Sequence, residues 1–136
     1  MIECKFVPSV CSYCGVGCGI LFHVVDGKIL ETLPLKSHPV NQGKLCIKGW
    51  NLHEFVMSEH RLKSPLIKDN GQFKEVSWDQ ALSEASHRFN QVIDKYGPDS
   101  VGVLCSAKIT SEENYLAQKF ARAVLGTNNV DHCARL

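Results

Sequence analysis

The chain has 136 residues, of which 44% are hydrophobic and 21% are charged, and its formal net charge is +1. This composition is ordinary for a globular protein and excludes disordered and collagen-like chains. A net charge near zero, without a run of like charges, gives no basis for binding nucleic acid through counterion release. The longest uncharged stretch near the N-terminus, from Val7 to Val25, is interrupted by Pro8 and three glycines, so no membrane span is expected.

The N-terminal residues give an expectation about the compartment. Residues 1–5 lack the basic segment and apolar core of a secretory signal, and they contain no twin arginine. We therefore expect a cytoplasmic protein, in which thiols stay reduced. The seven cysteines are then expected to be metal ligands or core residues rather than disulfide partners.

The first 50 residues contain five of the seven cysteines and six of the ten glycines. Two apolar runs between Ile20 and Leu33 flank Asp26-Gly27, a pair that accepts the positive φ angles of a type I′ turn and so predicts a hairpin. Residues 34–44 are rich in Pro, Asn and Gly and predict a loop. Residues 47–57 are expected to form a short helix.

The rest of the chain alternates between strand and helix patterns. Residues 65–76, centred on an Asn-Gly pair, predict a second hairpin or a strand pair that links two units. A capping box at Ser77–Gln80 begins a helix that ends at Gly97-Pro98. Residues 101–105 are typical of a short buried strand, and a second capping box at Thr110–Glu113 begins a helix that runs to Gly126. Helix, strand and helix in this order predict the start of an α/β sheet.

The cysteine spacing is the strongest functional signal. Cys11, Cys14 and Cys18 form a C-x2-C-x3-C motif, and Cys46 follows 27 residues later. Three neighbouring thiolates can bind three corners of a 4Fe–4S cube while a distant fourth thiolate binds the last corner. Glycines between and after these cysteines allow backbone N–H groups to approach the sulfurs. The spacing favours a 4Fe–4S cluster; a zinc site, which usually takes two compact ligand pairs, and incidental core cysteines are the alternatives.

Lys48, two residues after Cys46, would place a positive charge near such a cluster and raise its reduction potential. Position alone, however, favours a solvated surface lysine. Cys105 ends an apolar run and is expected in the core. His53-Glu54 begins like a zinc-protease motif, but Met57 stands where the second histidine would be required.

Two cysteine-containing segments resemble the N-terminal region of molybdopterin-dependent oxidoreductases: Cys11–Gly19 (CSYCGVGCG) and Asn41–Gly49 (NQGKLCIKG). Residues 76–82 (VSWDQAL) and 119–131 (KFARAVLGTNNVD) make the chain most similar to the catalytic (alpha) subunits of formate dehydrogenases. The chain departs from that pattern at Lys108 and Ser111, where formate dehydrogenases commonly have Arg and Asn.

The resemblance implies that the four cysteines hold one 4Fe–4S cluster and that Lys48 lies on the electron path between cluster and pterin. It implies molybdenum or tungsten bound by two pyranopterin guanine dinucleotides. Formate would be oxidised to CO2, and an electron-acceptor subunit or iron–sulfur protein would take the two electrons. We expect residues 1–60 to form a small antiparallel β domain around the cluster. Residues 61–136 are expected to form the N-terminal part of an incomplete α/β (Rossmann-like) domain, with apolar surface exposed on Leu82, Phe89 and Val92 or on residues 101–105.

The same resemblance implies that the metal-ligating cysteine or selenocysteine directly follows Leu136, so no catalytic residue is expected within the chain. Because family members are several times longer, we expect the N-terminal piece of a selenocysteine-containing formate dehydrogenase, ended at an in-frame UGA codon and inactive alone. The alternatives are a stand-alone 4Fe–4S electron-transfer module, a zinc-stapled binding module, or a related molybdopterin enzyme such as nitrate reductase, formylmethanofuran dehydrogenase or the large subunit of NADH dehydrogenase.

Overall fold

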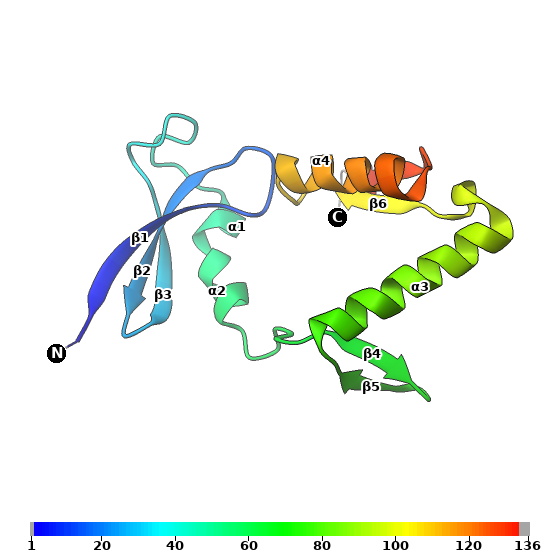
Figure 1. Cartoon of the computed structure of the whole chain (residues 1–136). Helices are drawn as coiled ribbons and strands as arrows, with labels where there is room; N and C mark the ends of the chain where they lie inside the picture. The colour runs from blue at the N-terminus through cyan, green and yellow to red at the C-terminus, as the bar shows by residue number, and fades with distance from the viewer. Residues whose placement is uncertain (1, 134–136) are drawn as a thin grey trace. The chain divides into compact units, whose positions relative to one another are not determined.

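A computed structural model describes residues 2–133, which divide into two compact units. The first unit contains the chain up to Arg61 together with Ser106–Tyr115 and Cys133, and the second contains Leu62–Cys105 and Leu116–His132. Figure 1 shows the elements in chain order, coloured from blue to red. Each unit is therefore built from segments that are distant in the sequence.

A three-stranded antiparallel sheet forms the centre of the first unit. Its strands are β1 (Cys4–Val10), β2 (Gly19–Val25) and β3 (Lys28–Pro34), in the order β1-β2-β3 (Figure 1). Asp26 and Gly27 connect β2 to β3 with φ angles of 46° and 77°, which is the left-handed conformation that a type I′ turn requires. The hairpin predicted from this Asp-Gly pair is confirmed.

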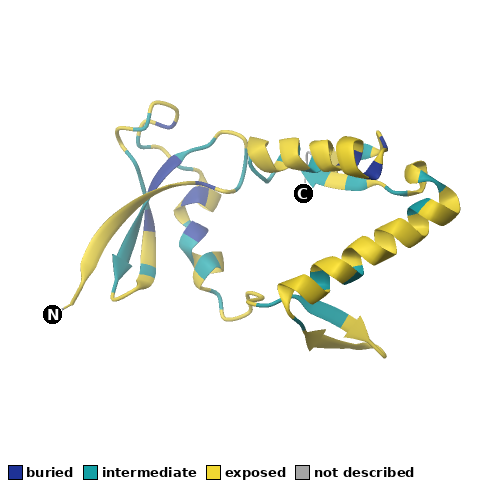
Figure 2. Cartoon of the chain, viewed as in Figure 1, coloured by how far each residue is buried: buried dark blue, intermediate teal, exposed yellow. Residues whose placement is uncertain are grey.

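Two short helices, α1 (Ile47–Trp50) and α2 (Leu52–Met57), stand where one helix was predicted. Asn51 separates them, because its backbone is not helical (φ −101°, ψ 18°) and its side-chain amide donates a hydrogen bond to the Ile47 carbonyl (2.8 Å). The buried side chains of Cys11, Ile20 and Leu52 form the core of this unit. In Figure 2, buried positions are coloured dark blue along the chain. The first cysteine of the motif, Cys11, is thus itself part of the hydrophobic core of this unit.

The second unit opens with a hairpin and a long helix. Strands β4 (Leu66–Asp69) and β5 (Gln72–Glu75) are antiparallel and meet at Asn70-Gly71, where both φ angles are positive, as the sequence predicts. Helix α3 (Trp78–Tyr96) follows, and the hydroxyl of Ser77 accepts a hydrogen bond from the Gln80 N–H (3.2 Å). This is the predicted N-terminal cap.

Two further strands, β6 (Val103–Ser106) and β7 (Val130–Cys133), form a pair. The Val103 N–H donates to the Asn129 carbonyl (2.9 Å) and the Ala107 N–H donates to the Cys133 carbonyl (3.1 Å), so both strands run in the same direction. The 3-10 turn η1 (Pro98–Ser100) precedes β6. Helix α4 (Ser111–Phe120) and the π-helical turn η2 (Ala121–Leu125) connect the two parallel strands. This strand–helix–strand arrangement confirms the predicted α/β character.

The start of α4 shows the predicted capping box in full. The Glu113 N–H donates to the Thr110 hydroxyl (3.2 Å), and the Thr110 N–H donates to the Glu113 carboxylate (2.8 Å). The other end is closed by Gly126, whose φ of 77° allows the left-handed conformation that ends many helices.

Burial in the second unit differs from the prediction for residues 101–105. The strand begins at Val103 and its residues are half-buried except Leu104, which is 86% exposed. The strand is therefore less buried than its apolar pattern indicates, and Leu104 provides the exposed apolar surface that was expected on residues 101–105. Exposure of the apolar stripe on α3 is confirmed, because Leu82 is 61% exposed and Phe89 and Val92 are each 38% exposed. Figure 2 shows both α3 and α4 largely in yellow. None of the helices in residues 2–133 has the length and apolar character needed to cross a bilayer.

Candidate metal centre

Two loops of the first unit line one cavity of about 330 Å³. One loop connects β1 to β2, and the other leads into α1. All four cysteines of the predicted ligand set line this cavity: Cys11, Cys14, Cys18 and Cys46. Its other walls come from Tyr13, Leu45, Ile47, Lys48, Gly49, Ala107 and Lys108. The structure therefore brings together the thiols that the sequence pattern singled out, together with Lys48.

Backbone hydrogen bonds hold the first loop closed. The Cys11 N–H donates to the Cys18 carbonyl (2.8 Å) at the base of the loop, and the Gly17 N–H donates to the Cys14 carbonyl (3.3 Å) within it. Gly17 has a φ of 63°, which side chains with a Cβ rarely adopt. These constraints close the loop that carries the first three cysteines of the motif.

Asn41 links the first loop to the second. Its side-chain oxygen accepts a hydrogen bond from the Gly19 N–H (2.9 Å), and its side-chain amide donates to the carbonyls of Gly19 (3.1 Å) and Lys44 (2.9 Å). Asn41 is only 7% exposed, so these bonds satisfy backbone groups that water reaches poorly. Gly19 directly follows Cys18 and Lys44 lies two residues before Cys46, so one buried side chain fixes the distance between the loops.

The glycines of the first loop have a second role besides turn formation. A Cβ atom on Gly19 would lie 2.5 Å from the ring of His38, and a Cβ atom on Gly15 would lie 2.7 Å from the hydroxyl oxygen of Ser111. Neither distance is compatible with normal packing. That the glycines let backbone N–H groups approach the sulfurs stays a prediction; the structure adds that Gly15 and Gly19 leave room for neighbouring side chains.

The four thiols influence one another electrostatically. Burial raises the pKa of Cys18, and the nearby thiols of Cys11, Cys14 and Cys46 raise it further. The pKa of Cys46 is lowered instead, chiefly by the backbone N–H dipole of Gly49 and then by the backbone and side-chain charge of Lys48, although burial opposes this effect. Four thiolates confined in one cavity repel one another, and a cationic metal group at their centre would offset that repulsion.

Four thiols on one cavity are donors that fit a 4Fe–4S cube. In a single-zinc site with bonds of about 2.3 Å, the sulfurs lie only about 3.8 Å apart. Within the part of the chain that the structure describes, no three Cys, His, Asp or Glu side chains are grouped closely enough to hold one metal ion. The four thiols instead surround a cavity of about 330 Å³. Four thiol donors spread around a common space are the ligand set of a 4Fe–4S cube.

Two lysines also line the cavity. The Lys48 ammonium nitrogen lies 6.0 Å from the centre of the Tyr13 ring, which packs edge-on against Phe55 at 5.8 Å. Lys108 reaches the same cavity from the segment after β6. No local pattern marks Lys108 as a site residue, because it is 62 positions from Cys46 and only the fold brings the two together.

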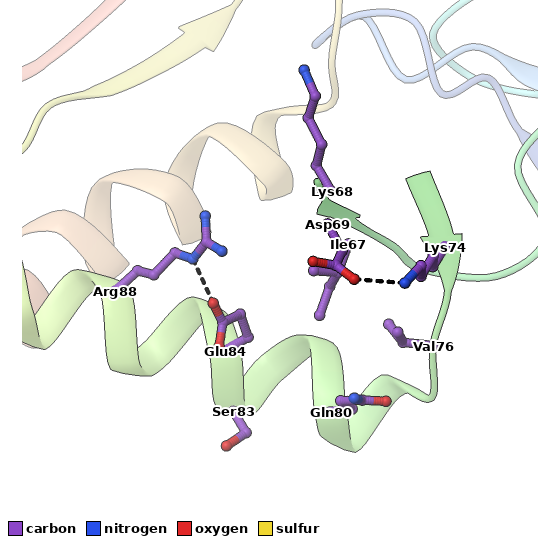
Figure 3. A pocket seen from close by; sticks show the side chains of 9 residues that line it. All are labelled: Ile67, Lys68, Asp69, Lys74, Val76, Gln80, Ser83, Glu84 and Arg88. Atoms are coloured by element: carbon purple, nitrogen blue, oxygen red, sulfur yellow. Dashed lines mark hydrogen bonds and ion pairs between the residues drawn. The ribbon is translucent and has the colours of Figure 1, made fainter. Parts of the chain in front are cut away.

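Other candidate positions lie elsewhere. Cys105 belongs to β6 and is half-buried in the second unit. The metal ligand expected after Leu136 lies outside the described residues. A larger cavity of about 490 Å³, between the β4–β5 hairpin and α3, has no thiol in its lining (Figure 3). Ion pairs Lys74–Asp69 and Arg88–Glu84, each 2.6 Å long, neutralise four of its charged side chains, so it offers no comparable donor set.

An antiparallel sheet with a cavity lined by four cysteines, followed by a parallel strand–helix–strand segment, is the arrangement expected of an iron–sulfur domain followed by an α/β domain. Comparison with known families agrees. Residues 4–58 match the molybdopterin oxidoreductase Fe4S4 domain, and residues 61–136 match the molybdopterin oxidoreductase family. The chain belongs to the molybdopterin oxidoreductases, whose cofactors are a 4Fe–4S cluster and a molybdenum or tungsten pterin.

Similar proteins include several formate dehydrogenase subunits. The chain is 52% identical to the F420-dependent formate dehydrogenase 1 subunit alpha of Methanococcus maripaludis, over 99% of this chain and 19% of that protein. It is 46% identical to the corresponding subunit of Methanocaldococcus jannaschii, with the same two coverages. Among solved structures, acetylene hydratase from Pelobacter acetylenicus matches with a TM-score of 0.72 and 28% identity, over 92% of this chain and 18% of that one. The chain thus spans about a fifth of the length of these relatives.

Proposed function

We propose that this chain is the iron–sulfur region of a formate dehydrogenase catalytic (alpha) subunit, and that Cys11, Cys14, Cys18 and Cys46 bind its 4Fe–4S cluster. The observation that supports this most directly is the convergence of all four thiols on one cavity from two separate loops. The cluster, when bound, takes up and releases single electrons. The chain contributes the thiolates and the hydrogen bonds of Asn41 that set the loop spacing.

Lys48 is proposed to act on electron transfer through its charge. Its side chain lines the cavity beside Cys46, and a cation close to a cluster stabilises the reduced, more negative form. We propose that residues 1–60 form the cluster domain and that residues 61–136 begin the α/β domain of a longer protein.

In that longer protein, we propose that formate is oxidised to CO2 with release of one proton and two electrons, and that an electron-acceptor subunit receives the electrons. The names of the relatives support formate as the substrate. A cytoplasmic location and a cysteine or selenocysteine as the ligand of molybdenum or tungsten stay predictions.

The test is anaerobic loading of the purified chain with iron and sulfide. We expect a brown protein with iron and sulfide in equal amounts and the electron paramagnetic resonance signal of a reduced 4Fe–4S cluster. Replacement of any one of the four cysteines with serine should sharply reduce iron retention, whereas Cys105→Ser, in the second unit, should retain it. A colourless chain that binds zinc but no iron would instead support a zinc-stapled module.

Formate as the substrate needs a separate test. The full-length protein should reduce a dye when formate is added, and it should lose this activity when the cluster is absent. If the full-length protein has an intact cluster and a loaded pterin site but does not oxidise formate, formate is not the substrate. The assignment of the cluster ligands would be unaffected by that result. A cluster-containing chain without any larger gene product would support a stand-alone electron-transfer module.

A further inference from the structure

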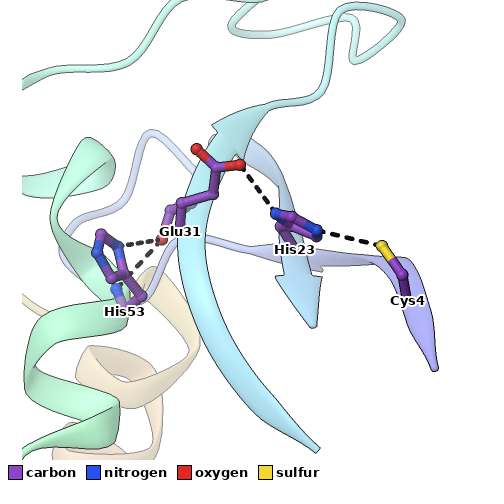
Figure 4. A network of polar contacts seen from close by, with 5 residues as sticks. Cys4, His23, Glu31 and His53 are labelled. Atoms are coloured by element: carbon purple, nitrogen blue, oxygen red, sulfur yellow. Dashed lines mark hydrogen bonds and ion pairs between the residues drawn. The ribbon is translucent and has the colours of Figure 1, made fainter. Parts of the chain in front are cut away.

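A cysteine, a histidine and a glutamate form a connected row on the sheet of the first unit. The Cys4 sulfur lies 3.2 Å from Nε2 of His23, and Nδ1 of His23 lies 3.0 Å from a carboxylate oxygen of Glu31. Figure 4 shows one of these residues on each strand of the sheet. From this geometry we infer that Cys4 is a reactive thiol that forms mixed disulfides with small disulfide compounds.

The strand register places the three side chains on the same face. His23 lies opposite Phe6 on β1 and opposite Glu31 on β3. Cys4 is two residues before Phe6, so it points to the same side of the sheet and is a diagonal neighbour of His23. The Phe6 ring stacks on the imidazole, with 4.9 Å between ring centres and 22° between planes. The imidazole is therefore oriented by contacts on both nitrogens and on one face.

The contacts of His23 determine which nitrogen can act as a base. An ionised carboxylate only accepts hydrogen bonds, so Glu31 favours the tautomer with the proton on Nδ1. Nε2 then presents a lone pair to the Cys4 thiol. A nucleophile within hydrogen-bond distance of a base, with the base oriented by a third group, is the arrangement that activates cysteine thiols.

Cys4 is separate from the cysteine-lined cavity. It lies at the opposite end of β1 from Cys11, and seven residues of extended strand correspond to about 23 Å. All seven residues of β1 are exposed, so a small disulfide can approach the Cys4 sulfur. Disulfide exchange needs only a thiolate and an accessible sulfur atom, so it does not require an enclosed pocket and can take place on an exposed strand.

The reaction balances without a further oxidant. The Cys4 proton passes to Nε2 of His23, and the thiolate attacks one sulfur of a disulfide R–S–S–R. The S–S bond of that compound breaks, a Cys4–S–S–R bond forms, and the thiolate R–S⁻ leaves and takes up a proton. The small disulfide is the oxidant, and a free thiol R–SH reverses the step.

The test uses the purified, cluster-loaded chain under anaerobic conditions, with oxidised glutathione as the probe. Peptide mass spectrometry measures the rate at which Cys4 gains a glutathione. We expect folded wild-type protein at pH 7 to react at least about tenfold faster than a synthetic peptide of residues 2–10, which contains Cys4 but lacks His23. A rate equal to or below that of the peptide would overturn the inference, and this comparison needs no variant to fold.

Three variants separate activation from exposure. His23→Gln should slow the reaction of Cys4 by about tenfold, and Glu31→Gln should slow it by a smaller factor. Glu3→Gln is the matched control, because it also removes one exposed carboxylate next to Cys4, but its partner is Lys5 (3.0 Å) rather than His23. Its rate should equal that of wild type. Equal rates in all three variants, with far-ultraviolet circular dichroism unchanged, would show that Cys4 is merely exposed.

Discussion

Replacement of Asn41 with alanine tests whether this one side chain sets the distance between the two cysteine loops. The substitution removes three hydrogen bonds to buried or half-buried backbone, with lengths of 2.9, 3.1 and 2.9 Å. The Gly19 carbonyl keeps another partner, the Leu35 N–H at 3.0 Å, but the Gly19 N–H and the Lys44 carbonyl lose theirs. With about 1 kcal/mol for each bond and more for an orphaned buried group, we expect a loss of about 3 kcal/mol.

The assay is urea unfolding of the cluster-loaded chain, followed by circular dichroism and by the visible absorbance of the cluster. Asn41→Ala should also release iron faster to a chelator, because Cys18 and Cys46 are no longer held at a fixed separation. Asn51→Ala is the matched control: it removes a single exposed hydrogen bond, to the Ile47 carbonyl, and should cost less than about 1 kcal/mol. If both variants lose the same stability and release iron equally fast, Asn41 does not link the loops.

Three further predictions concern the same site. Gly19→Ala should destabilise the chain by about 1–3 kcal/mol in the same urea assay, because the new Cβ would lie 2.5 Å from the neighbouring imidazole ring. Lys48→Gln should lower the midpoint potential of the cluster in a redox titration followed by electron paramagnetic resonance, whereas Lys44→Gln, which does not line the cavity, should leave it nearly unchanged. In the metal-free chain, the pKa of Cys46 is lowered and the pKa of Cys18 is raised, so the Cys46 thiolate forms at lower pH than the Cys18 thiolate. Iodoacetamide labelling across a pH series should therefore give a lower midpoint pH for Cys46 than for Cys18. A lower midpoint for Cys18 would contradict the stated causes of the two shifts.

The elements that were predicted correctly from the sequence are those whose structure is determined by interactions between residues a few positions apart. Asp26-Gly27 and Asn70-Gly71 form turns because the turn conformation is a property of those two residues. Ser77 and Thr110 begin helices because each side chain satisfies a backbone N–H three residues away. The cysteine motif also has a local cause, since three ligands within eight residues already determine one side of a metal site.

The elements that differ from the sequence-based predictions depend on contacts that a local sequence pattern does not reveal. The helix predicted over residues 47–57 divides because the Asn51 amide bonds the Ile47 carbonyl and its backbone leaves the helical region. Residues 101–105 have the apolar pattern of a buried strand, yet β6 pairs with β7 and leaves Leu104 86% exposed, which is the apolar surface that was expected on this segment. An apolar pattern indicates that a segment prefers to be buried. The segment becomes buried only where another helix or sheet packs against it.

Lys108 shows how the two family regions of the chain meet at one site. It belongs to the region that matches the molybdopterin oxidoreductase family, yet it lines the cavity whose cysteines belong to the Fe4S4 region. Its backbone N–H donates to the Ser106 hydroxyl (3.0 Å), and the Asn114 amide donates to the Ser106 carbonyl (3.0 Å), so the end of β6 and the start of α4 hold the segment in place. The cavity is therefore not complete within residues 4–58. Because Ser106 and Asn114 hold this wall, changes at these two residues can alter the surroundings of the four thiols without touching a cysteine.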